Sequence, residues 1–223
     1  MTTLTYYSET GPLRDAALFM KFYSQAPEHR RRKIDSFVFD KDKRLSLGVE
    51  LLLRKALEDL GEDPDSLQPA HVANGKPMLK GTDIEFNLSH SEERVMCSVS
   101  DRPVGCDVEM VRPIDLDLAR RYFYGSEYEG IKAEDDPDRR YDLFYRYWTL
   151  KESFMKATGL GFELPLDSFC IHLDHEITVD QSVDSETYRF AEYFLDDGYR
   201  YAVCSQSGDF PPGMRHVGFD KYS

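Results

Sequence analysis

The feature that most constrains the fold is an amphipathic helix in the second half of the chain, YWTLKESFMKATGLG at residues 147–161. Apolar side chains recur there at the helical period and would cover one side of the helix. Gly159 and Gly161 end the pattern, as glycines commonly end helices. A helix of this kind packs its apolar side into the protein. That side consists of Phe144, Tyr147, Phe154, Met155 and Thr158.

Three charged residues interrupt this helix. Lys151 lies in the middle of the apolar stripe, where its amine must reach either water or an anion. Glu152 lies at the edge of the stripe, and Lys156 follows one turn later. These charges mark the helix as a candidate functional element.

In the segment GCDVEM, residues 105–110, apolar and acidic residues alternate, which is typical of a strand. Asp107 and Glu109 therefore share one face, opposite an apolar one. Two carboxylates side by side near a core repel each other unless a cation lies between them. The pattern predicts a positively charged ligand at this strand.

The rest of the chain predicts an α+β fold. In the first half, the patterns predict helices at 13–25, 27–37 and 42–60 and strands at 71–73, 78–80, 84–89 and 95–100. In the second half, they predict helices at 117–124, from Ser126 and from Pro137, and strands at 169–173, 177–179, 189–195 and 199–204. Glu129, three residues after Ser126, gives a capping-box pattern at the second of these helices.

The two halves resemble each other in their order of elements. Each has a long helix that ends at a glycine, followed by an Asp-Ser pair and then by strands. We therefore expect two similar α+β subdomains, residues 1–102 and 103–223, related by a pseudo-twofold with the active site in the cleft between them.

Composition excludes several classes of protein. A net charge of -13 argues against bulk nucleic-acid binding, which needs a basic face. No apolar run has the length of a membrane span, and the first residues lack the pattern of a signal peptide. The four cysteines form no CxxC pair, so we expect buried, reduced thiols in a cytoplasmic protein.

A basic run, His29-Arg30-Arg31-Arg32-Lys33, stands out in this acidic chain. A solvated helix face is one explanation for it, and an anion-binding site is the other. Arg44 favours the anion, because the first turn of a helix is an unfavourable place for a cation.

Four motifs in a fixed order, NGKPML, FNLSHS, GCDVEM and WTLKESFMK, resemble the 4'-phosphopantetheinyl transferases of the two-domain, surfactin-synthetase-activating (Sfp) type. Each motif alone is weak, but together they cover nearly the whole chain. The resemblance implies transfer of the phosphopantetheine arm of coenzyme A to a serine of an acyl or peptidyl carrier protein. It also implies release of 3',5'-ADP, dependence on Mg²⁺, and activation of nonribosomal peptide, polyketide or fatty acid synthases.

The same resemblance assigns roles to residues. It implies that Asp107, Glu109 and Glu152 bind the metal, that Lys156 neutralises the leaving group, and that Glu152 can take the proton of the serine. It places the coenzyme's phosphate and adenine in the first subdomain and the metal in the second. The basic run 29–33 and Arg44 match positions that hold the coenzyme's 3'-phosphate, near His90. The residues that the resemblance implies for coenzyme binding are His29, Arg32, Arg44, Lys76, Ser89, His90, Asp107, Lys151 and Lys156.

Two departures from the family pattern concern the phosphate contacts. His29 stands where relatives commonly carry Lys or Arg, and Leu45 stands where many carry a small hydroxyl residue, so that one contact is lost or moved to Ser46. For Lys151, a surface lysine that only packs its stem is the alternative to a phosphate contact.

The expected protein is a monomer that binds coenzyme A and carrier proteins, which would dock on residues 114–124. The alternatives are an enzyme specialised for fatty-acid carrier protein, a catalytically idle relative that binds coenzyme A or a carrier, and a metal-dependent nucleotide hydrolase.

Overall fold

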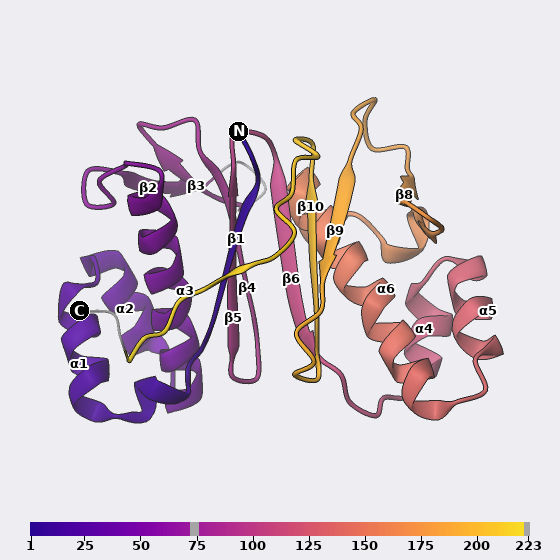
Figure 1. Ribbon diagram of the computed structural model, residues 1–223, viewed down its shortest axis with the longest axis horizontal. Coiled ribbons are helices and arrows are strands. Elements are labelled where there is room, and N and C mark those ends of the chain that lie inside the picture. The colour runs from indigo at the N-terminus through magenta and orange to yellow at the C-terminus, as the bar shows by residue number, and fades with distance from the viewer. Residues whose placement is uncertain (72–75, 221–223) are drawn as a thin grey trace.

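Two sheets stand side by side in the middle of the molecule, and helices cover their outer faces (Figure 1). The computed structural model describes residues 1–71 and 76–220. The first sheet has the order β11-β1-β5-β4 and the second β6-β10-β9. Their strands are β1 (Leu4–Glu9), β4 (Glu85–Ser91), β5 (Arg94–Ser100), β6 (Val104–Met110), β9 (Arg189–Tyr193), β10 (Tyr199–Ser205) and β11 (Arg215–His216).

Each half adds three helices and a small hairpin to its sheet. The hairpins are β2 (Gln68–His71) with β3 (Pro77–Lys80) and β7 (Cys170–Leu173) with β8 (Ile177–Asp180). The helices are α1 (Ala16–Gln25), α2 (Glu28–Ser36), α3 (Asp40–Asp59), α4 (Asp117–Tyr122), α5 (Gly125–Ala133) and α6 (Pro137–Thr158). Three single 3₁₀ turns lie at Gly11–Arg14, Gly161–Glu163 and Leu166–Ser168.

The two halves repeat one topology. In each, a strand is followed by two short helices, a long helix, a hairpin and two further strands, and the sheet orders β1-β5-β4 and β6-β10-β9 correspond position by position. The predicted α+β class is confirmed. The repeat of topology supports the expected relation between the halves.

The long helix α6 begins and ends where the sequence predicts. The side chain of Asp136 accepts hydrogen bonds from the backbone amides of residues 138 and 139, and Pro137 occupies the first turn. Gly159 ends the helix with φ +74°, in the left-handed region that glycine adopts without strain.

A close backbone contact sets α6 against β6. A Cβ atom at Gly105 would lie 2.0 Å from the carbonyl oxygen of Ser153 and 2.4 Å from the backbone nitrogen of Ala157. Only glycine fits there. The backbones of the strand and the helix therefore touch, which brings the strand's carboxylates beside the charged side chains of α6.

The first strand and the last were not predicted. β1 pairs antiparallel with β5 in the centre of the first sheet, and β11 pairs parallel with β1. Val217 and Phe219 pack into the core of the first half. Residues 215–219, which we assigned to the second subdomain, therefore belong structurally to the first.

Two local predictions also differ from the structure. Helix α5 begins at Gly125, and the side chain of Glu127 accepts the backbone amide of Tyr124 at 3.0 Å, so the capping pattern drawn from Ser126 and Glu129 was wrong by two residues. The predicted turn at Asn74-Gly75, with the last residues of the strand predicted before it, lies outside the described residues.

Two further observations concern the whole chain. All four cysteines are free and buried, as expected. Within residues 1–71 and 76–220, no helix combines the length and the apolar character that crossing a bilayer requires.

Candidate active site

The candidate site lies where the edge strands of the two sheets meet. Strands β4 and β6 stand side by side at the seam between the halves (Figure 1). Their contact is made by side chains of β4 that accept hydrogen bonds from backbone amides of β6. These bonds run from Cys106 to Asn87, from Val108 to Ser89 and from Met110 to Ser91.

The same hydroxyls hold the two carboxylates of β6. Ser89 donates to Asp107 Oδ1 at 2.7 Å, and Ser91 donates to Glu109 Oε2 at 2.7 Å. From the opposite side, Lys156 Nζ on α6 lies 2.6 Å from Asp107 Oδ1. The strand's acidic face, predicted from alternation alone, is thus enclosed between β4 and α6.

Glu152 points into the same enclosure. Its Oε1 atom and Oδ2 of Asp107 are both buried, and neither has a hydrogen-bond partner among residues 1–71 and 76–220. A buried carboxylate oxygen without a partner loses its hydration and gains nothing in exchange. Two such oxygens from separate elements indicate that the site is built for a ligand that carries positive charge or donates hydrogen bonds.

The pKa values reflect this crowding. Burial, and then the charge of Asp107, raise the pKa of Glu109 to about 7. Burial also raises the pKa of Glu152, while Lys156 opposes that rise and Asp107 adds to it. For Lys156, burial is the largest influence and acts to lower the pKa, but the charges of Asp107, Cys106 and Glu152 and the hydrogen bond to Asp107 together raise it, so this side chain remains an ammonium.

The donor set fits a divalent cation in part. Hard cations such as Mg²⁺ take oxygen ligands and keep several positions for water and phosphate. Asp107 Oδ2 and Glu152 Oε1 are oxygens of this kind, and Glu109 lies beside Asp107 on the strand. Within the described part of the chain, no three His, Cys, Asp or Glu side chains are gathered closely enough to hold a metal by themselves. A cation here therefore needs further oxygens, from water or from a bound substrate, to complete its coordination.

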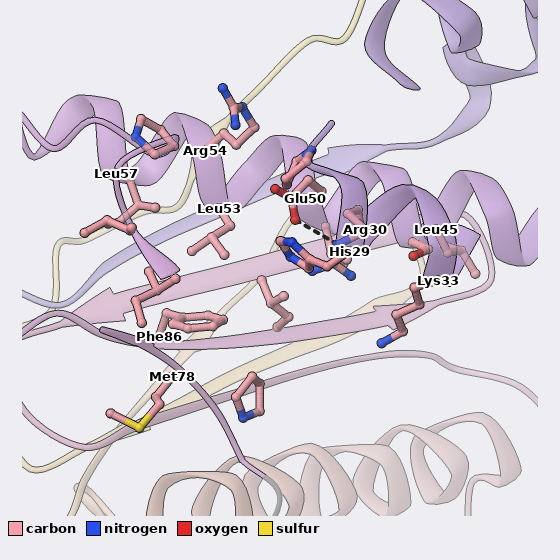
Figure 2. Close-up of a pocket in the computed structure, with 18 of the residues that line it drawn as sticks. His29, Arg30, Lys33, Leu45, Glu50, Leu53, Arg54, Leu57, Met78 and Phe86 are labelled. Carbon is pink, nitrogen blue, oxygen red and sulfur yellow. Dashed lines mark hydrogen bonds and ion pairs between the residues drawn. The ribbon is translucent and has the colours of Figure 1, made fainter. Parts of the chain in front are cut away.

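A large cavity opens next to this site in the first half (Figure 2). Its volume is about 670 Å³, and it lies between α2, α3 and the strands β3 and β4. Its apolar wall includes Val49, Leu53, Leu57, Leu79, Phe86 and Leu88, and its polar wall includes His29, Arg30, Lys33, Ser46, Glu50 and His90.

The basic groups of the cavity lower one another's pKa. Burial, and then the charge of Arg30, lower the pKa of Lys33. Partial burial, and then the charges of Lys156 and Lys33, lower the pKa of His90. Clustered cations of this kind are more readily accommodated when an anion binds among them.

Comparison with known proteins identifies the family. A family model described as "4'-phosphopantetheinyl transferase superfamily" matches residues 103–204, and one described as "4'-phosphopantetheinyl transferase, N-terminal" matches residues 14–101. The 4'-phosphopantetheinyl transferase Sfp of Bacillus subtilis (strain 168) is 34% identical over 207 residues, which cover 91% of each chain. The chain belongs to the 4'-phosphopantetheinyl transferase family. It is an enzyme of the Sfp type.

A second relative agrees with this assignment. The 4'-phosphopantetheinyl transferase gsp of Aneurinibacillus migulanus is 33% identical over 192 residues, covering 84% of this chain and 81% of the relative. The solved structure of Thermotoga maritima holo-acyl-carrier-protein synthase (AcpS) matches with a TM-score of 0.40 and 19% identity, over 46% of this chain and 61% of that chain.

The structure brings many of the transferase's predicted site residues together. Asp107, Glu109, Glu152, Lys156 and Ser89 surround the enclosure between β4, β6 and α6. His29 and His90 line the adjoining cavity.

Lys151 is not among the side chains at the site. Its side chain is fully buried, and Nζ lies 2.9 Å from Glu127 and donates to the backbone carbonyls of Leu166 and Phe169 at 2.8 and 2.7 Å. Three acceptors match the three donors of an ammonium. The anion that the sequence required for Lys151 is thus a carboxylate of the protein itself, and the lysine ties α6 to α5 and to the 3₁₀ turn before β7.

Three further predicted residues lie outside the cavity lining. Arg32 is exposed and paired with Glu28 on its own helix. Lys76 lies 3.3 Å from Glu85 and donates to the backbone of Val104. Arg44 is half-buried, and its Nε is buried without a hydrogen-bond partner.

Sequence reasoning singled out the basic run 29–33 but named Arg32 from it as a coenzyme contact and did not find Glu50. Arg30 and Lys33, rather than Arg32, face the cavity. The helical period held the signal, because Ile34 is the buried position of α2 and Arg30 lies one turn before it, whereas Arg32 points about 200° away. Glu50 could not have been found in this way, since its role depends on the packing of α2 on α3.

Proposed function

We propose that this transferase moves the 4'-phosphopantetheine arm of coenzyme A to a serine of a carrier protein in a reaction that requires Mg²⁺ and releases 3',5'-ADP. The observation that carries the proposal is the pair of buried, unpartnered oxygens, Asp107 Oδ2 and Glu152 Oε1, beside the ammonium of Lys156. Coenzyme A carries a diphosphate, whose oxygens would complete a cation site that these carboxylates and Glu109 begin.

In this proposal Asp107, Glu109 and Glu152 hold the cation. When bound, Mg²⁺ would neutralise charge on the diphosphate oxygens as the phosphoryl bond breaks. The raised pKa of Glu109 supports this role, because a partly protonated carboxyl beside Asp107 becomes a stable carboxylate once positive charge is added.

The protein's own side chains would supply the rest of the reaction. Lys156 is held by Ser89 and by the backbone carbonyl of Cys106, in addition to Asp107. From this position its ammonium would stabilise the charge that develops on the leaving 3',5'-ADP. Glu152 would accept the proton of the carrier serine.

The cavity next to the site would hold the nucleotide half of coenzyme A. His29, Lys33 and His90 bring basic side chains to its wall, in support of a phosphate there. Arg44, through its unpartnered Nε, and Lys76, which comes from the segment beside the cavity, remain candidates for coenzyme contact. Arg32 and Lys151 are left out of the proposed site because both pair with carboxylates elsewhere.

The carrier would dock beside the metal strand on the segment 114–124. Leu118, Tyr122 and Tyr124 are exposed there, with 37%, 42% and 45% of their surface accessible. Phe123 instead belongs to the core, with 4% accessible. Replacing Leu118 by Asp should weaken transfer to a carrier without unfolding the protein, and unchanged transfer would remove this surface from the proposal.

We place the enzyme in the cytoplasm as a monomer. Four free, buried thiols support a reducing compartment. Gel filtration at working concentration tests the monomer directly.

The test of the function mixes the enzyme with coenzyme A, Mg²⁺ and several apo-carriers, followed by mass spectrometry of the carriers. A mass gain of one phosphopantetheine is expected with Mg²⁺ and not with a chelator. Asp107→Asn, which keeps the shape and removes the charge, should abolish the gain, while Asp180→Asn, an exposed carboxylate on β8, should not. Release of 3',5'-ADP without a carrier would indicate a hydrolase, and neither product would indicate an idle relative.

A further inference from the structure

The turn between β4 and β5 contains a strained residue. Within residues 1–71 and 76–220, Glu92 and Asp196 are the two residues other than glycine whose φ lies in the left-handed region, at +52° for Glu92. That conformation crowds Cβ against the backbone, so short turns between strands favour Gly, Asn or Asp there. A glutamate in this position must be fixed by its surroundings, and residues of this kind concentrate at functional sites.

The side chain of Glu92 connects the two halves. Its Oε2 forms an ion pair with Lys41, at the start of α3 in the first half. Its Oε1 accepts a hydrogen bond from Arg112 Nη1 at 3.3 Å, and Arg112 follows β6 in the second half. Figure 1 shows the turn after β4 and the chain that leaves β6 at the same end of the two sheets. The carboxylate therefore joins one cation from each half at that end.

This contact extends the joint between β4 and β6 beyond the strands. The joint itself consists of three side chains that accept from backbone amides of β6, those of Asn87, Ser89 and Ser91. In a longer strand the next residue on this face would be Glu93. The chain turns first, however, and Glu93 pairs with Arg14 inside the first half. Glu92 instead supplies the next contact across the seam.

Stability alone does not account for Glu92. All three side chains of this contact are partly exposed, and ion pairs between exposed side chains add little to the stability of a protein. The strain of the backbone opposes even that gain. Glycine would adopt the same conformation without strain, so a turn that only joined β4 to β5 would be about as stable with glycine. What the carboxylate adds is a fixed position for Arg112.

The position of Arg112 affects how the chain leaves β6. A hydrogen bond to the hydroxyl of Tyr145 on α6 raises the pKa of Arg112, so the guanidinium lies between α6 and the turn of the first half. Pro113 follows, and a residue before a proline is largely confined to extended conformations. An Arg112 that is held at its side chain therefore restricts the direction in which the segment 114–124 begins.

We infer that Glu92 is a positioning residue for transfer to the carrier, because it holds Arg112, and through it the segment 114–124, in a fixed position relative to the first half. This inference rests on the proposed function, in which coenzyme A lies in the first half and the carrier docks on that segment. The serine of the carrier reaches the coenzyme only when the two are correctly placed. Glu92 acts through Arg112 and touches neither substrate.

The first experiment measures steady-state transfer to one apo-carrier. Glu92→Gly removes the carboxylate and the strain together, so its melting temperature should lie within about 3 °C of the wild type. KM for the carrier should rise about three- to fivefold, as an exposed ion pair allows, while KM for coenzyme A stays within about twofold. Glu92→Gln leaves the backbone as it is and removes the charge, and it should show the same rise. Glu93→Gln is the matched control in the same turn, and both constants should stay unchanged.

Two further measurements test whether Glu92 acts through Arg112. In the Arg112→Ala background, Glu92→Gly should change KM for the carrier less than about twofold, as expected of two residues that act as one unit. Without any carrier, hydrogen exchange at the amides of residues 114–124 should be at least about threefold faster in Glu92→Gly than in the wild type. Exchange in Glu93→Gln should match the wild type.

Several results would overturn the inference. It is wrong if both Glu92 variants keep the wild-type KM for the carrier, or if Glu93→Gln raises that KM equally. An equal rise in KM for coenzyme A, additive effects in the double variant, or unchanged exchange in Glu92→Gly would also contradict it. Failure of the proposed function would look different, since the wild type would then modify no carrier, while the exchange measurement would still test the contact.

Discussion

Gly105→Ala tests whether the contact between β6 and α6 builds the active site. The added Cβ would lie 2.0 Å from the carbonyl oxygen of Ser153, while ordinary contacts begin near 3.4 Å. The two backbones must therefore separate by about 1.4 Å, since neither contact atom belongs to a flexible side chain. Overpacking costs about 1–3 kcal/mol, and a clash between two backbones should reach the upper end. A loss of about 3 kcal/mol lowers the melting temperature of a chain this long by about 6–12 °C.

The effect on activity follows from the same displacement. Lys156 and Glu152 both belong to α6, so a shift of the helix moves both side chains away from Asp107 on β6. A misplacement of about 1 Å can cost about 100-fold in rate, and we expect a loss of that size in transfer to an apo-carrier at a temperature where the variant is folded. Gly213→Ala is the control, because no atom lies within 4 Å of the added Cβ. If both variants match the wild type in melting temperature and rate, the close contact does not position the site.

The remaining predictions concern charge. Lys151→Met should lower the free energy of unfolding in urea by about 3–5 kcal/mol, because it leaves the buried carboxylate of Glu127 unpaired. Removing both charges should restore most of the stability. A single variant as stable as the wild type would refute the structural role of Lys151. Lys33→Ala should raise KM for coenzyme A about tenfold, whereas Arg32→Ala should change it less than about twofold. Equal effects would contradict the conclusion that Lys33, and not Arg32, faces the cavity. Because the pKa of Glu109 is raised from 4.5 to about 7, its contribution to the stability of the free protein is complete below pH 4.5 and is lost as the pH rises through 7. Mg²⁺ should therefore raise the melting temperature more above pH 7 than near pH 4.5, and Glu109→Gln should lose this difference.

Patterns that depend on local geometry could be predicted from the sequence. The start of α6 at Pro137 and its end at Gly159 follow from dihedral preferences of single residues. The paired faces of β6 follow from the alternation of a strand, and the structure buries Cys106 and Val108 as that pattern requires. These elements carry Asp107 and Lys156, so the elements at the centre of the site could be predicted from the sequence.

Partners that come from distant segments could not be predicted in the same way. β1 contains Thr, Tyr and Ser, and its short pattern alone does not distinguish a central strand from an irregular start. Its place is decided by pairing with β5, about 90 residues later in the chain. Lys151 shows the same limit. Its position in an apolar stripe indicated that it needed an anion, but only the packing of α5 on α6 shows that Glu127 supplies one.

The seam between β4 and β6 explains why the site forms where it does. A complete backbone ladder between these edge strands would merge the two sheets and place the strands about 4.8 Å apart. Instead, Ser89 and Ser91 take the place of backbone acceptors and at the same time donate to Asp107 and Glu109. Each hydroxyl thus satisfies a backbone amide of β6 and orients a carboxylate. Ser89→Ala would leave the amide of Val108 and one oxygen of Asp107 without these partners, so a single missing hydroxyl should loosen both the joint between the halves and the acidic face that the proposed chemistry needs.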